Sequence, residues 1–271
     1  MNDSMETPTT GTTTEGVPYL LRAPRSGAAD APLIVAWHLL DPPRTEAAFA
    51  AAIPLDGLDA WRLYLGLPMS GSRAPEGGMD AIFGLMAQDA PGLLHGPIHS
   101  QAVAEAPAAI AEVRERAGIV DGVPVGLMGG SMGGAIVAEL LATRALDARA
   151  AVLLNPLLEL RPMIDAFAPM VGGYTWTSAG DAAAASIDYV RRAGEVAASG
   201  AAVRVIVGLA DEPWFVASAQ AFAAAAGADL QPVDGVGHAL ADEPGVEPAP
   251  QSDGARTYDA LAADWFRRHL L

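Results

Sequence analysis

The chain has 271 residues, of which 51% are hydrophobic and 18% charged, and it contains no cysteine. The apolar share is ample for a buried core and excludes a disordered chain, and the lack of cysteine excludes disulfides and thiolate chemistry. There are 32 acidic residues against 16 basic ones, so the net charge is −16. Such a surface repels phosphate backbones and anionic lipid, and we expect neither a nucleic-acid nor a membrane partner.

Residues 1–15 are polar and rich in threonine, without periodicity, and we predict that they form a flexible tail. They contain neither the basic nor the apolar region of a secretory signal peptide. A cytoplasmic location is therefore the default expectation, and a mature exported form remains the alternative.

From residue 16 onward, strand and helix signals alternate, which predicts one domain over residues 16–271. Short apolar or β-branched runs predict strands at 17–22, 32–38, 61–67, 123–128, 149–155, 203–208 and 229–233. Helical spacing of apolar residues predicts helices at 44–52, 101–117, 132–143, 182–199, 212–226 and 254–270. This alternation is typical of an α/β fold with a mainly parallel central sheet and helices on both faces.

Two segments interrupt the alternation, residues 70–100 and a short irregular insertion at 156–181. Long irregular connections in such folds tend to lie over the functional site and shape its pocket. Residues 123–142 are long and apolar enough to imitate a membrane span, but Pro124 and five glycines interrupt them, so we interpret them as strand, turn and helix.

The strongest local motif is the sequence GGSMGG at residues 129–134, between a predicted strand and a predicted helix. A G-x-S-x-G sequence in this context predicts a nucleophile elbow at 129–133, a sharp turn in which glycines relieve crowding around the serine. The turn would lift the Ser131 hydroxyl above the sheet edge and direct the first free N–H groups of the helix toward a ligand.

A serine nucleophile needs a base and a group that orients the base. Of the five histidines, His238 lies in a glycine-rich loop just after the last predicted strand, so it is the candidate base. Asp211 follows the strand at 203–208 and is the candidate acid, with Glu212 as its competitor. Asp211 is preferred because its shorter side chain suits a rigid orienting contact.

The order of these residues along the chain is nucleophile, acid and base, as in α/β-hydrolases. The sequence resembles the α/β-hydrolase superfamily over residues 17–271, and most of all its smaller carboxylesterases and dienelactone-hydrolase-like members. The resemblance is carried by the GGSMGG elbow, the GLAD sequence at the acid, the GVGH loop, and AWH at the end of the second strand. It implies a mainly parallel sheet of seven or eight strands.

The resemblance also implies an oxyanion hole formed by the N–H of Met132 and a second N–H from the loop after His38. The family commonly has a glycine after this histidine, but here Leu39 and Leu40 follow it. We expect Leu40 to be the second donor, with Leu39 as the next candidate. His38 is interpreted as a structural anchor for the loop.

We expect the pocket to be lined by Trp214, Trp176, Tyr174 and His99. No cofactor is expected, since no G-x-G-x-x-G sequence opens the first strand–helix unit. No metal is expected either. His95 and His99 are four residues apart, but Gly96 and Pro97 between them argue against the helix that would bring them onto one face.

These residues predict a serine hydrolase that cleaves a carboxylic ester of a small or medium substrate through an acyl-enzyme. Thioesterase, lactonase and amidase or peptidase activities use the same residues and remain alternatives. A non-catalytic ligand-binding protein of the same fold is a further alternative, because a fold does not dictate function. The sequence leaves the substrate and the oligomeric state open.

Overall fold

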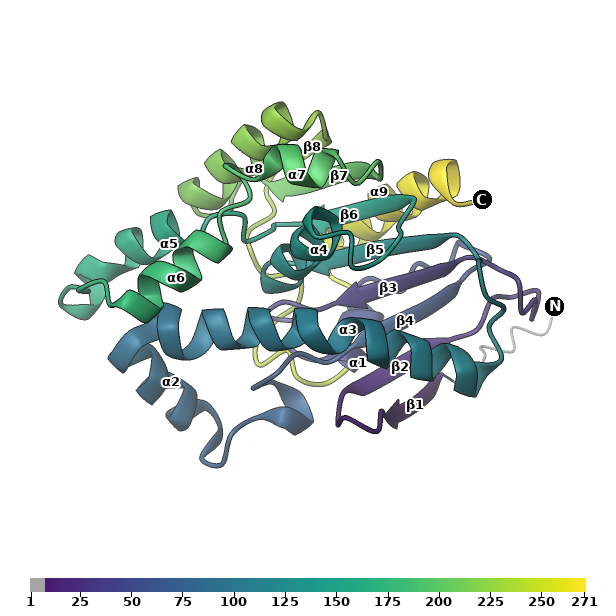
Figure 1. Cartoon of the computed structure of the whole chain (residues 1–271), viewed down its shortest axis with the longest axis horizontal. Helices are drawn as coiled ribbons and strands as arrows, with labels where there is room; N and C mark the ends of the chain where they lie inside the picture. Colours follow the sequence, from purple (N-terminus) through teal and green to yellow (C-terminus); the bar gives the residue numbers. More distant parts are fainter. Residues whose placement is uncertain (1–7) are drawn as a thin grey trace.

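A computed structural model describes residues 8–271, which form an eight-stranded sheet in the order β1-β2-β4-β3-β5-β6-β7-β8 (Figure 1). The strands are β1 (Thr9–Thr12), β2 (Pro18–Arg22), β3 (Leu33–Trp37), β4 (Trp61–Leu65), β5 (Val125–Gly130), β6 (Ala150–Leu154), β7 (Ala202–Gly208) and β8 (Asp229–Val233). The strands from β4 to β8 are parallel, and β1 and β2 add an antiparallel edge. The predicted α/β fold with a mainly parallel sheet is confirmed.

Helices cover both faces of this sheet, as Figure 1 shows. Alternate residues of β3 divide between two cores: Leu33, Val35 and Trp37 pack with α3 (Gly96–Ala117), α4 (Met132–Ala142) and α8 (Pro213–Ala226). Ile34 and Ala36 pack on the opposite face with α1 (Glu46–Ala52) and α9 (Asp253–His269). Strands buried on both faces explain the apolar runs without alternation in the sequence.

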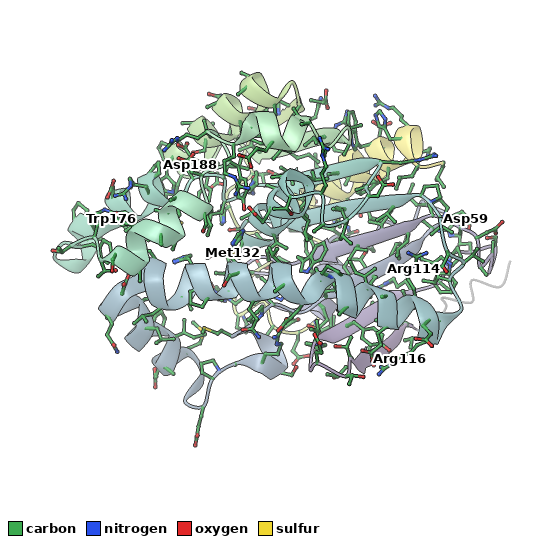
Figure 2. All side chains as sticks on the ribbon, in the orientation of Figure 1. Asp59, Arg114, Arg116, Met132, Trp176 and Asp188 are labelled. Atoms are coloured by element: carbon green, nitrogen blue, oxygen red, sulfur yellow. The ribbon has the colours of Figure 1, made fainter. Side chains whose placement is uncertain are left out.

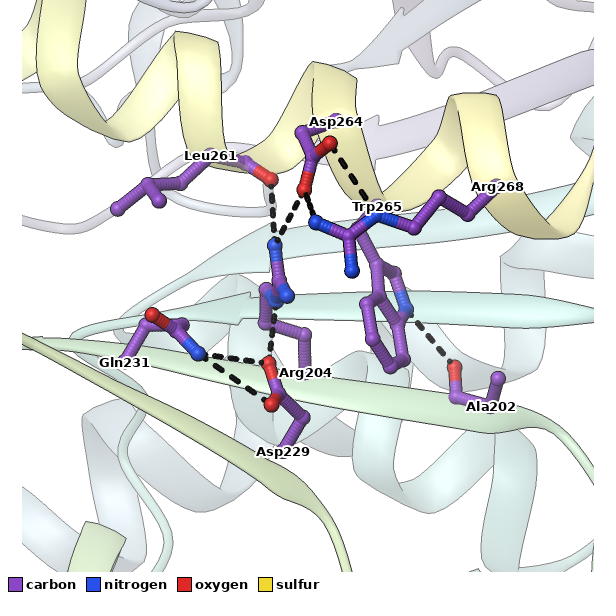
Figure 3. Close-up of polar contacts among 8 residues, drawn as sticks. All are labelled: Ala202, Arg204, Asp229, Gln231, Leu261, Asp264, Trp265 and Arg268. Carbon is purple, nitrogen blue, oxygen red and sulfur yellow. Dashed lines mark hydrogen bonds and ion pairs between the residues drawn. The ribbon is translucent and has the colours of Figure 1, made fainter.

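A charge cluster around the buried Arg204 links α9 to β7 and β8 (Figure 3). Arg204 of β7 is 3% exposed and donates from Nε to Asp229 of β8 at 2.5 Å and from Nη1 to Asp264 of α9 at 3.3 Å. Trp265 donates from its indole nitrogen to the carbonyl of Ala202. Because two carboxylates compensate the buried guanidinium, the cluster holds α9 and β8 in fixed register on β7.

The prediction of a flexible tail at 1–15 is wrong where the structure describes it. Residues 1–7 lie outside the described residues. Thr9–Thr12 forms β1, which pairs antiparallel with β2, Thr9 opposite Leu21 and Thr12 opposite Pro18. The polar composition of this segment suits an exposed edge strand, whose stability comes from backbone pairing rather than from buried side chains.

The predicted helix over 182–199 is two helices, α6 (Ser178–Ser186) and α7 (Ala193–Ala197). Between them the backbone pairs with a segment that follows β6. The N–H of Leu160 donates to the carbonyl of Ile187 at 2.9 Å, and the N–H of Tyr189 donates to the carbonyl of Leu158 at 2.7 Å. These bonds replace helical ones, so tertiary pairing overrides local helix propensity.

The two irregular segments contain helices that the sequence pattern did not predict. They are η1 (Gly71–Arg73), α2 (Gly78–Asp89), η2 (Ala90–His95), α5 (Leu160–Phe167) and η3 (Ala168–Val171). Helix α3 begins at Gly96, so the expectation that Gly96 and Pro97 prevent a helix there is wrong. Pro97 lies in the first turn of the helix, where no backbone N–H is needed.

We refer to α2, η2, α5, η3 and α6 together as the cap, which lies beyond the carboxyl end of the sheet, at the left in Figure 1. Asp89, at the end of α2, joins α2 to the segment between η3 and α6. Its carboxylate accepts hydrogen bonds from Tyr174 at 2.5 Å and from Thr177 at 2.6 Å, and also from the N–H of Gly92. Within residues 8–271, no helix combines the length and the apolarity needed to cross a bilayer.

Candidate active site

Ser131 lies at the tight turn between β5 and α4. Its backbone has φ 47° and ψ −113°, a conformation that non-glycine residues rarely adopt. A Cβ on Gly129 would lie 2.1 Å from the carbonyl oxygen of Gly133, and a Cβ on Gly133 would lie 2.2 Å from that of Trp37. Only glycine fits at these positions, which explains the G-x-S-x-G sequence. The strained turn raises the hydroxyl above the carboxyl edge of the sheet.

His238 lies between Ser131 and Asp211. Its Nε2 is 2.9 Å from the hydroxyl oxygen of Ser131, and its Nδ1 is 2.8 Å from a carboxylate oxygen of Asp211. The three residues follow β5, β7 and β8, whose carboxyl ends meet at one edge of the parallel sheet. The structure thus brings together the three side chains that the sequence selected for a nucleophile, a base and an acid.

Asp211, rather than Glu212, contacts the imidazole. The side chain of Asp211 is fully buried, and its second carboxylate oxygen accepts a hydrogen bond from the N–H of Glu212 at 2.7 Å. Glu212 is exposed at the start of α8. A buried carboxylate with both oxygens engaged is a rigid partner for the ring.

An aromatic row supports the other side of His238. The ring of Phe215 stacks on the imidazole with centroids 4.1 Å apart, and Trp214 packs against Phe215 and, edge to face, against Phe167. These contacts connect the base to α5 of the cap. They also place Trp214, one of the predicted pocket residues, next to the residue that covers the imidazole.

Asn155 anchors both the histidine loop and the acid strand, a role that the sequence analysis missed. Its side-chain amide donates to the carbonyls of Gly237 and His238 at 2.9 and 3.0 Å. Its oxygen accepts from the N–H of Gly208 at 2.9 Å and from the hydroxyl of Tyr258 at 2.7 Å. The available signal was a polar amide at the end of an apolar strand, where a buried polar group requires partners.

His38 fixes the loop that follows β3. It is buried, its Nε2 accepts from the N–H of Leu67 at 3.1 Å, and its Nδ1 lies 2.6 Å from the carbonyl oxygen of Leu39. Burial lowers the pKa of His38 to about 4, partly offset by the bond to Leu39, so the ring is neutral at pH 7. These contacts suit the structural anchor that we expected.

The candidate oxyanion donors lie around the same loop. Met132 is the first residue of α4, where a backbone N–H has no partner within the helix. The carbonyl of Leu40 accepts from Arg44, and the side chain of Leu39 is fully buried beneath Gly130. The loop is therefore held through its carbonyl groups and the Leu39 side chain, not through the N–H groups expected to bind an oxyanion.

In three of the four predicted pocket residues, the polar atom is engaged by another side chain. Tyr174 bonds to Asp89, and Trp176 lies on the outer cap, away from Met132 (Figure 2), where its indole nitrogen donates to Asp165. His99 is buried in α3, with Nε2 2.7 Å from the hydroxyl of Tyr189, which donates to Glu139. Burial lowers the pKa of His99 to about 4, so it is a neutral member of this buried network.

Across residues 8–271, no group of three or more histidine, aspartate or glutamate side chains is arranged to hold a metal ion. At the sheet edge, Asp211 and His238 instead pair with each other, and they bond further to the N–H of Glu212 and to the hydroxyl of Ser131.

Comparison with solved structures shows the α/β-hydrolase fold. Est1E from Butyrivibrio proteoclasticus is similar at a TM-score of 0.62 with 13% identity, over 96% of this chain and 98% of that one. Carboxyl esterase 2 from the fungus Tuber melanosporum is similar at a TM-score of 0.58 with 17% identity, over 99% and 90%. A metagenomic α/β-hydrolase enzyme from the lagoon of Mar Chica is similar at 0.56 with 16% identity, over 96% and 98%.

No protein-family model and no curated protein matches the sequence. The resemblance predicted from the elbow and the order of the three side chains is thus confirmed at the level of the fold.

Proposed function

We propose that this protein is a serine hydrolase that cleaves a carboxylic ester of a small or medium substrate through an acyl-enzyme. The observation that supports it most directly is the row of contacts from Ser131 through His238 to Asp211, at 2.9 and 2.8 Å. A serine hydroxyl is a weak nucleophile at neutral pH, and a hydrogen-bonded imidazole is the group that activates it.

In the proposed first step, His238 accepts the proton of Ser131 at Nε2 as the serine oxygen attacks the ester carbonyl. Asp211 holds Nδ1–H and stabilises the charged ring. The carbonyl oxygen becomes an oxyanion, for which we assign the N–H groups of Met132 and Leu40 as donors, with Leu39 as the alternative to Leu40.

The proposed acylation is complete when the carbon–oxygen bond to the alcohol breaks and the alcohol leaves with the proton from Nε2 of His238. In the deacylation that follows, water gives a proton to the same nitrogen as it attacks the acyl carbon. The bond from the acyl carbon to the serine oxygen then breaks, Nε2 returns its proton to Ser131, and the carboxylic acid leaves. Of the four pocket residues expected from the sequence, we retain Trp214 as the one nearest the acyl or alcohol group, through its packing on Phe215.

Thioester, lactone and amide substrates would use the same residues, and a binding protein without turnover is the contrasting possibility. The position of His238 between Ser131 and Asp211 favours turnover. A site that only binds a ligand has no need of an imidazole between a strained serine and a buried carboxylate.

The test has two parts. We expect a fluorophosphonate probe to form one covalent adduct at Ser131, located by peptide mass spectrometry, and p-nitrophenyl acetate or butyrate to be hydrolysed. Ser131→Ala should abolish labelling and lower turnover by about 10⁴-fold or more while retaining the circular-dichroism spectrum. An unlabelled, folded wild-type protein without esterase activity would rule out the proposal in favour of a binding function.

A further inference from the structure

Asp41 lies beside the nitrogen of His238 that contacts Ser131. Its carboxylate Oδ2 is 3.7 Å from Nε2, whereas Asp211 occupies the opposite ring nitrogen. The imidazole therefore has a carboxylate near each nitrogen. Asp211 is buried and hydrogen-bonded to the ring, but the side chain of Asp41 is 54% exposed and lies outside hydrogen-bond distance. Asp41 is thus available to a molecule that approaches Nε2.

The backbone on both sides of Asp41 is fixed. The carbonyl of Leu40 accepts from Nε of Arg44 at 2.9 Å, and the carbonyl of Pro42 accepts from the N–H of Leu240 at 3.0 Å. The N–H of Arg44 also donates to the carbonyl of Gly245 at 2.7 Å. The loop that carries Asp41 is therefore tied to the segment that follows His238, and this holds the backbone of Asp41 next to the base.

Nearby cationic groups do not neutralise this carboxylate. The guanidinium of Arg44 is engaged by Glu243 and by the carbonyl of Pro244. Burial lowers the pKa of His95 and so disfavours the charged form of this ring, and the hydrogen bond to the carbonyl of Ala90 and the charge of Asp41 offset this only in part. Over residues 8–271, the side chain within ion-pair distance of the Asp41 carboxylate is the imidazole of His238.

We infer that Asp41 makes the site select esters whose alcohol part carries a positive charge, such as esters of amino alcohols. The inference rests on the function proposed above. The oxygen of the departing alcohol must reach Nε2 of His238 to take its proton, so atoms two or three bonds beyond it come within a few ångströms of the carboxylate. A cation there is attracted and an anion is repelled.

The test compares two esters of the same shape. Acetylcholine carries a quaternary nitrogen, and 3,3-dimethylbutyl acetate has a carbon in its place. For the wild-type protein we expect kcat/KM to favour acetylcholine by about fivefold, the scale of a half-exposed charge pair. Asp41→Asn should remove the preference mainly through KM, and Asp41→Lys should reverse it. Raising the ionic strength should reduce the wild-type preference.

The matched control is Asp30→Asn. Asp30 is exposed and precedes β3, at the amino ends of the parallel strands, so removal of its charge should keep the wild-type preference. Hydrolysis of both esters at equal kcat/KM, or a preference unchanged in Asp41→Asn, overturns the role of Asp41 alone. Lack of turnover of both esters together with lack of fluorophosphonate labelling overturns the proposed function, and this inference with it. Thermal unfolding of each variant verifies that it is folded.

Discussion

The carboxyl edge of the sheet and the cap over it are stabilised in different ways. At the edge, Asn155 and His38 are almost fully buried, and each bonds to backbone groups of other segments. In the cap, large apolar side chains remain exposed, among them Phe83 at 57% and Met170 at 66%. Asp89, the last residue of α2, bonds to Tyr174 and Thr177 in the segment before α6.

The groups proposed for chemistry thus belong to the buried core, whereas the cap is mixed: α5 and α6 contribute Leu160, Ile164 and Ala183 to that core, but α2 buries only Asp89. A segment with few buried apolar contacts opens locally at a lower free energy than the core. Substitutions at the carboxyl edge of the sheet should therefore lower turnover strongly. Substitutions in the cap should mainly make the cap open more readily, with less effect on the stability of the core. The following substitutions test that division.

Asp211→Asn should lower kcat by about 10⁴-fold, because the amide no longer stabilises the charged imidazole or its required tautomer. Steady-state kinetics with p-nitrophenyl butyrate measure this loss. Glu212→Gln is the control in the adjacent residue and should remain within a few-fold of wild type. Equal losses in the two variants would show that the acid has been assigned to the wrong carboxylate.

Asn155→Asp should lower kcat by about 100-fold with a small change in KM, the scale expected when a base is displaced by about 1 Å. The carboxylate still accepts from Gly208 and Tyr258 but no longer donates to the carbonyls of Gly237 and His238. Tyr258→Phe serves as the comparison, since it removes one bond to Asn155 and leaves the histidine loop tied. A wild-type kcat in Asn155→Asp would contradict the proposal that Asn155 positions His238.

Asp89→Ala should open the cap without unfolding the sheet. Loss of the bonds from Tyr174 and Thr177 should cost about 2 kcal/mol locally, which corresponds to amide exchange in α6 about thirtyfold faster. Hydrogen-exchange mass spectrometry measures this directly. Asp80→Ala, at an exposed position in the first turn of α2, should leave the exchange as it is. Faster exchange in β5 and β6 as well would mean that cap and sheet form one cooperative unit.

Asp259→Asn tests a site away from the catalytic edge. Burial raises the pKa of Asp259 to about 6, above the ordinary value of 3.8, although its carboxylate accepts from the N–H of Leu55. The folded state therefore binds the proton more tightly, and this residue's contribution to stability falls as pH rises from about 4 to 6. The variant should lack that loss and unfold about 2 °C higher at pH 8, with unchanged kcat.

The strands and the elbow could be predicted from sequence because their signals are local. Apolar runs mark strands that are buried on both faces, and the glycines around Ser131 mark a turn without space for side chains. Ser131, Asp211 and His238 were found because each follows a strand, and parallel strands end at one edge.

The cap and Asn155 could not be predicted in this way because their structure depends on distant segments. The break between α6 and α7 arises from pairing with Leu158 and Leu160, a contact that helix propensity does not contain. Asn155 ends a strand without any motif, and its four side-chain partners come from three other segments. Aromatic composition alone likewise did not distinguish Trp214, beside the base, from Trp176, on the outer cap.

The anchoring of the histidine loop by Asn155 has a practical consequence for protein engineering. The anchor holds the backbone at Gly237 and His238, before the proline-rich stretch at 243–250 begins. Residues 247–250, which lie beyond the bonds of Arg44 to Gly245 and of Thr45 to Val246, are exposed and can therefore be exchanged for loops from other proteins. A graft at that place leaves the imidazole in its original alignment, because the bonds of Asn155 to Gly237 and His238 lie outside the exchanged residues.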